Sequence, residues 1–133
     1  MPYSEWYKII TMTKNSIAAL LLATATFEHC NWMSALKEFI EDDTGLTDMQ
    51  VKSPNECDLG KWINSDESSD FGNYQEFIEL KEFHKNLHAL GAEVVEKKRV
   101  GDIQGAKNLI KEMKPISCRI IEQIEKLKEK ISQ

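Results

Sequence analysis

The apolar residues of the last thirty positions recur at alternating steps of four and three, from Leu109 to Ile131. This spacing places them on one stripe of an α-helix, whereas the faces of a β-strand alternate with a period of two. No segment of the chain shows the sustained alternation of apolar and polar positions, with β-branched residues, that is typical of strands. The sequence therefore predicts an all-α fold, a four-helix bundle with an additional short helix.

Turn-forming residues divide the chain into helical segments, which we predict over residues 4–41, from residue 53 onward for a short helix, over 73–99 and over 102–131. Ser53, Pro54 and Glu56 form a capping box that starts the short helix. Asn73 and Glu76 form a second capping box. The polar stretch 64–72 is expected to be an exposed loop.

Length and charge limit the classes of protein that the chain can belong to. Its 133 residues fit a single domain, 1–133, that can bury a core without disulfides. The net charge of -5 argues against a nucleic-acid partner, because phosphate binding relies on clustered Lys and Arg. The one dense basic stretch, 97–99, is expected to end a helix, where cations meet the negative end of the helix dipole.

The cysteine count and the apolar segments point to the cytoplasm. Three cysteines fit a disulfide framework poorly and a reducing compartment well. The apolar run 17–25 is about half the ~20 residues that a membrane-spanning helix needs. The same run looks like the core of a signal peptide, but Glu5 does not belong in a basic leader. We expect a cytoplasmic protein with no membrane partner.

Two histidines four residues apart, His84 and His88, project from one face of the predicted helix over 73–99. That face is the apolar one, so both imidazoles are expected to lie inside the bundle. His29 and Cys57 bring the ligand count to the four that a closed tetrahedral zinc site uses. Cys57 is expected in the first turn of the short helix, where the helix dipole favours the thiolate that binds metal or reacts with oxidants.

Other interpretations of these residues remain open. A lone pair of histidines on an amphipathic helix is more often a matter of packing than of metal binding. Cys30 and Cys118 are expected to be small buried core residues. A di-iron site would need several glutamates, an iron–sulfur cluster usually four cysteines, and calcium more oxygen ligands.

The motifs taken together resemble the chemoreceptor zinc-binding (CZB) domain family in order and spacing. They are His29-x-x-Trp32-x-x-x-Leu36, then Ser53-Pro54-x-x-Cys57-x-Leu59-Gly60-Lys61-Trp62, then His84-x-x-x-His88. The resemblance covers about residues 20–131 and leaves 1–19 as an N-terminal extension of the first helix. It implies a cytoplasmic, usually homodimeric four-helix bundle with zinc on His29, Cys57, His84 and His88. Family members are sensory modules of bacterial chemoreceptors, diguanylate cyclases and other signalling proteins, and they respond to zinc or, through the zinc-bound cysteine, to hypochlorous acid. We expect a free-standing member.

Three functions are compatible with these observations. The first is a zinc-binding sensory module of chemotaxis or cyclic-di-GMP signalling that works as a homodimer with a signalling partner and is not an enzyme. The second is a metal-free bundle that serves dimerisation. The third is a hydrolase that uses Cys57 with a histidine, or an open zinc site; the sequence offers it no oxyanion-hole motif and no HExxH glutamate.

Overall fold

A computed structural model describes residues 6–41 and 57–131 of the chain. Within these ranges all regular structure is helical, as the sequence predicted. The elements are α1 (Trp6–Glu41), α2 (Asp58–Ile63), the 3-10 helix η2 (Asp66–Phe71), α3 (Gln75–Arg99) and α4 (Ile103–Ile131). Among the residues that the structure describes, the bundle consists of three long helices and the short α2, whose N-terminal end carries Cys57.

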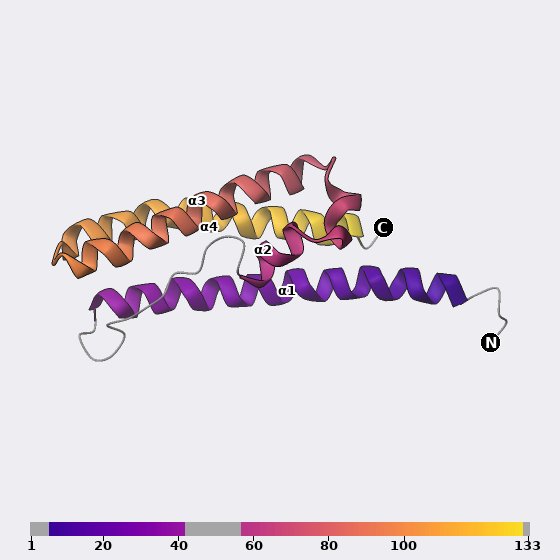
Figure 1. Ribbon diagram of the computed structural model, residues 1–133, viewed down its shortest axis with the longest axis horizontal. Coiled ribbons are helices and arrows are strands. Elements are labelled where there is room, and N and C mark those ends of the chain that lie inside the picture. The colour runs from indigo at the N-terminus through magenta and orange to yellow at the C-terminus, as the bar shows by residue number, and fades with distance from the viewer. Residues whose placement is uncertain (1–5, 42–56, 132–133) are drawn as a thin grey trace.

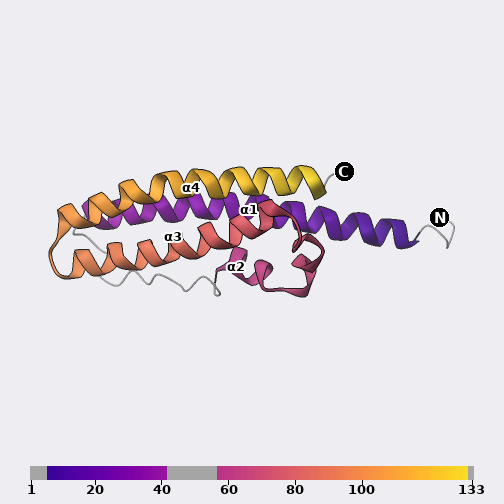
Figure 2. The ribbon, with the colours of Figure 1, turned by 90° about the horizontal axis from the view of Figure 1, so that it is seen from above.

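The helices α3 and α4 form an antiparallel hairpin, and α1 lies along it (Figure 1). Most of α1 lies beside the hairpin and packs mainly on α4, while its N-terminal end continues past the end of the hairpin (Figure 2). The helix α2 lies between α1 and α3, near the middle of α1. The helices α1 and α3, which are separated in the sequence, therefore meet around the N-terminal end of α2.

The turn between α3 and α4 is fixed by a glycine and an aspartate. Gly101 has a φ of 83°, a left-handed conformation that suits glycine, and it ends α3. Asp102 Oδ1 accepts a hydrogen bond of 2.9 Å from the Gly105 amide and caps α4. The predicted ends of both helices at this turn are confirmed, as is the position of the basic stretch 97–99 in the last turn of α3.

The predicted start of α3 is wrong by two residues. Tyr74 is the N-cap and its side chain makes no capping bond, so Asn73 and Glu76 do not form a capping box. Glu76 instead pairs with Lys130 of α4 at 2.8 Å, and the Lys130 ammonium lies 4.4 Å from the centre of the Tyr74 ring. A contact with a residue distant in the sequence has displaced the local capping motif. The other predicted box, at 53–56, lies outside the described residues.

The stretch 64–72 is exposed at most of its described side chains, as its polar residues predicted, but it is not an irregular loop. Residues 66–71 form η2, and Ser68 is buried, with its hydroxyl donating to the Ile63 carbonyl at 2.8 Å. Phe71 packs against Trp62 of α2, with ring centroids 5.9 Å apart. The segment thus joins α2 to the start of α3 as a packed element.

The core is lined by the apolar stripes that the sequence predicted for α3 and α4. The buried residues of α3 are Phe77, Leu80, His84, Leu87, Gly91, Val94 and Val95. Those of α4 include Met113, Ile120, Ile124 and Leu127, all fully buried.

Two cysteine predictions are wrong: Cys30 and Cys118 are both exposed, because each lies on the outer face of its helix.

Candidate metal centre

Cys57 is held in place by the start of α2. It is the N-cap residue, with extended backbone (φ -77°, ψ 160°), and its sulfur accepts a hydrogen bond from the Gly60 amide at 3.3 Å. The prediction that Cys57 lies inside the first turn is therefore wrong, because Cys57 immediately precedes the first residue of α2, Asp58. As the N-cap, its side chain turns back toward the unpaired amides of the helix and its sulfur lies at the helix end.

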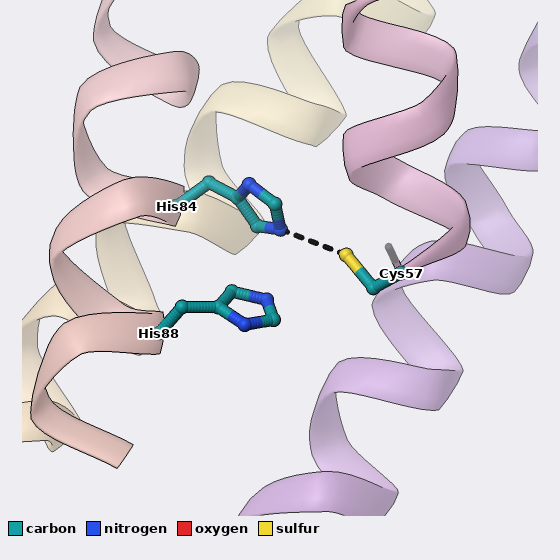
Figure 3. Close-up of side chains that lie close together, drawn as sticks. All are labelled: Cys57, His84 and His88. Carbon is teal, nitrogen blue, oxygen red and sulfur yellow. Dashed lines mark hydrogen bonds between the residues drawn. The ribbon is translucent and has the colours of Figure 1, made fainter. Parts of the chain in front are cut away.

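His84 and His88 face Cys57 from α3, as Figure 3 shows. The two rings stand one turn apart, with centroids 4.6 Å apart and planes at 71°. His84 Nε2 lies 3.0 Å from Cys57 Sγ, a hydrogen bond, and one ligand atom from each of the three residues lies within 4.8 Å of the others. Among the residues that the structure describes, no other group of three or more His, Cys, Asp or Glu side chains converges in this way.

His29 comes from α1 and lines the same cavity, but it does not belong to this group of three. Its Nε2 is hydrogen-bonded to Ser117 Oγ of α4 at 2.5 Å. The structure thus brings together three of the four predicted ligands. The role of His29 as the fourth ligand stays a prediction.

The cavity has a volume of about 240 Å³, and its wall is largely apolar. Trp32 covers one side, stacked on His88 with ring centroids 5.4 Å apart and planes at 19°. Sequence reasoning missed one lining residue with a charge, Glu28, although it directly precedes His29. The full lining is Ala25, Glu28, His29, Trp32, Cys57, Leu59, His84, Leu87 and His88.

Burial keeps His29 and His84 neutral. Desolvation, together with the nearby His88, lowers the pKa of His29 to about 4. Desolvation, then His88 and His29, lowers the pKa of His84 to about 4. Neutral imidazole is the form that binds a metal, so at neutral pH neither ring carries the extra proton that would prevent coordination.

The expectation that the helix end would lower the pKa of Cys57 is wrong. Burial raises the pKa of this thiol and outweighs the amides of Gly60 and Leu59, which favour the thiolate. The neighbouring Asp58 also disfavours the thiolate. A divalent cation is the charge that reverses this balance, since a coordinating thiol loses its proton to the metal.

The donor set fits zinc. One sulfur and imidazole nitrogens are the ligands that zinc prefers, and bond lengths of about 2.3 and 2.0–2.1 Å place such ligand atoms about 3.5 Å apart at tetrahedral angles. The ligand atoms of Cys57, His84 and His88 already lie at comparable separations. These residues would hold the ion, and only small side-chain movements are needed.

A comparison with known protein families identifies the family of the chain. Residues 29–95 match the family model of the chemoreceptor zinc-binding domain. The chain belongs to the CZB family. The match begins at His29 and includes Cys57, His84 and His88, but it is shorter than the 20–131 suggested by the motifs. No curated protein and no solved structure matches the chain significantly.

The family membership sets the coarse function. CZB domains are zinc-binding signalling modules and are regulatory and not catalytic. Over the described ranges, no helix combines the length and the apolar character that a membrane crossing requires.

Proposed function

We propose that this CZB protein is a cytoplasmic zinc-binding sensory module of bacterial signalling, of the chemotaxis or cyclic-di-GMP type. It responds to zinc availability, to oxidation of the zinc-bound Cys57, or to both. The observation that supports the proposal is the convergence of Cys57 from α2 with His84 and His88 from α3. His29 of α1 is the fourth ligand of the closed site.

Zinc would connect α2 to the long helices. With only six residues, α2 is too short to be a stable helix by itself, and it depends on the burial of Leu59, Trp62 and Ile63. A metal bond to Cys57 adds a second attachment at its N-terminal end. Loss of that bond changes the packing of α2 against α1 and α3, and this change is the signal that a chemoreceptor-type or diguanylate cyclase-type partner reads.

Oxidation breaks the same bond. Hypochlorous acid takes two electrons from the Cys57 thiolate, and the net products are the sulfenic acid Cys–SOH and chloride. A sulfenic acid is a poorer ligand than a thiolate, so zinc is released. The site would thus convert an oxidant signal into the same structural change as zinc loss.

Metal analysis and chelator competition test this proposal. We expect about one zinc per chain in the wild type and strongly reduced zinc binding in Cys57→Ala. Cys30→Ala and Cys118→Ala are matched controls, because both cysteines are exposed and outside the cavity, and these variants should bind zinc as the wild type does. Equal zinc retention by Cys57→Ala would refute the assignment.

A zinc indicator dye distinguishes the two signals. Hypochlorous acid at one equivalent should release zinc from the wild type and from both control variants. Zinc that remains bound while Cys57 is converted to the sulfenic acid would exclude the oxidant response and leave zinc itself as the signal.

The homodimer is also a proposal, supported by the outer face of α1. Ile17, Leu20, Leu21 and Phe27 recur on one face of this helix and are 41–67% exposed. The opposite face, with Ala18, Leu22 and Ala25, is buried in the bundle. A helix with two apolar faces covers the second one by packing on another chain, and we propose that a second copy does so here.

Light scattering coupled to gel filtration tests the dimer. Leu20→Glu places a charge in the middle of this face and should shift the protein toward the monomer. Ile78→Glu is a suitable control, because Ile78 is exposed to a similar extent (49%) but lies on α3. A dimer that survives Leu20→Glu, or a monomeric wild type, would contradict the proposal.

A further inference from the structure

The hydrogen bond between His29 and Ser117 excludes one use of the His29 ring. Nε2 of an imidazole has a single bonding position, which holds either a proton or a lone pair. While Nε2 is hydrogen-bonded to Ser117 Oγ, it cannot coordinate a metal. The residue that lines the cavity from α1 is thus held by α4 through the nitrogen that reaches furthest from its backbone.

We propose that Ser117 competes with zinc for His29 Nε2, so that zinc binding exchanges an α1–α4 hydrogen bond for a metal bond from α1 to α2 and α3. This inference rests on the proposed function, because it takes His29 as the fourth ligand. It adds a residue, Ser117, that neither the family motifs nor the donor set includes.

The geometry of the site favours competition between Ser117 and zinc over an arrangement in which Ser117 holds a zinc-bound His29 in place. Either ring nitrogen of a histidine is a possible ligand atom, yet neither nitrogen of His29 lies within the 4.8 Å group formed by Cys57, His84 and His88. The ring must therefore move to join them. Its bond to Ser117 is the contact that holds it away, across 88 positions of sequence.

The exchange gives the sensor a second structural output. Cys57 and the α3 histidines report on the position of α2, whereas the His29–Ser117 bond joins α1 to α4. Since α1 carries the exposed apolar face proposed for the second copy, a change in the contact between α1 and α4 reaches that face directly. Zinc would then alter the packing of all four helices and not of α2 alone.

Ser117→Ala tests the competition. The variant removes the competing hydroxyl, so we expect zinc to bind about fivefold more tightly, equivalent to about 1 kcal/mol, as measured by competition with a chelator of known affinity. Alanine also favours the helix slightly more than serine, but it does so with and without zinc and cancels from the affinity. Because the bond to Ser117 exists only without zinc, the chelator-treated variant should melt about 4 °C below the chelator-treated wild type.

Thr26→Ala is the matched control. It also removes a partly buried hydroxyl close to the cavity, but this hydroxyl donates its hydrogen bond to the Leu22 carbonyl within α1 and not to His29. Its zinc affinity should equal that of the wild type. In a His29→Ala background, Ser117→Ala should no longer change the affinity, because the nitrogen for which serine and zinc compete is gone.

The outcomes separate this inference from the proposed function. Weaker zinc binding by Ser117→Ala would show that Ser117 supports a zinc-bound His29 through its other nitrogen, and would overturn the competition. Unchanged affinity, or an effect that persists without His29, would overturn it as well. All three results leave zinc binding by Cys57, His84 and His88 intact, whereas a wild type that binds no zinc overturns both proposals.

Discussion

Cys57 is the N-cap of α2 and the proposed sulfur ligand of the metal, and two substitutions at this position distinguish these two roles. Its sulfur accepts the Gly60 amide bond that caps α2. Serine is a good N-cap residue and keeps an acceptor there, but it is a much poorer zinc ligand than cysteine. Alanine removes both functions. The pair Cys57→Ser and Cys57→Ala therefore measures the cap and the metal bond independently.

The expected magnitudes follow from the size of the chain and from these two interactions. Unfolding of 133 residues carries an entropy of about 0.28 kcal/mol per kelvin. Loss of an N-cap costs about 1 kcal/mol, or about 4 °C in Tm. Zinc at a free concentration of a hundred times its Kd stabilises the fold by about 2.7 kcal/mol, or about 10 °C.

Differential scanning calorimetry with chelator, and with buffered zinc, gives all six Tm values. The wild type should gain about 10 °C with zinc. Cys57→Ser should match the wild type in chelator and gain little with zinc, while Cys57→Ala should start about 4 °C lower and also gain little. A full zinc increment in Cys57→Ser would refute the sulfur as a ligand. A chelated Cys57→Ala that melts with the wild type would refute the cap.

Two further predictions concern acid and the core. The pKa values of His29 and His84 are about 4 in the fold and 6.5 in the unfolded chain, so the unfolded chain takes up protons first as pH falls. In chelator, the stabilising contribution of the two neutral histidines is fully present above pH 6.5. The free energy of unfolding should then fall by about 2 kcal/mol by pH 5, after allowance for solvent screening. Urea titrations measure this fall, which should be smaller in His84→Gln. Met113→Ala, at a fully buried site, should cost about 3 kcal/mol, or about 10 °C in Tm, whereas exposed Lys114→Ala should change Tm by less than about 2 °C.

The parts of the fold that could be predicted are those set by local sequence. The apolar stripes of α3 and α4 follow from helical periodicity, and the turn at Gly101 follows from a glycine that tolerates positive φ. The start of α3 could not be predicted, because Lys130 binds Glu76 from 54 positions away. For α1, apolar residues occupy two faces, and periodicity cannot say which face is turned inward.

The candidate site shows the same division. The spacing of His84 and His88 was enough to place both rings on one face of α3, because four residues make about one helical turn. The pKa of Cys57 could not be predicted from the helix end alone, since the burial that raises it comes from the surrounding helices. Ser117 carries no signal in the sequence, because its contact with His29 depends on how α1 and α4 align.

The distribution of the ligands over the helices explains why Cys57 is the residue through which such a site can sense. His84 and His88 are fixed relative to each other by α3, whose buried residues anchor it in the core. Zinc binding to these two residues alone would change the structure of the protein little. Cys57 belongs to a six-residue helix that packs far less extensively than α3 does on α4, so the metal bond to its sulfur contributes a larger share of what holds that element. We therefore expect metal loss or oxidation at Cys57 to act on α2, which packs least extensively among the described α-helices, while α3 and α4 keep the fold.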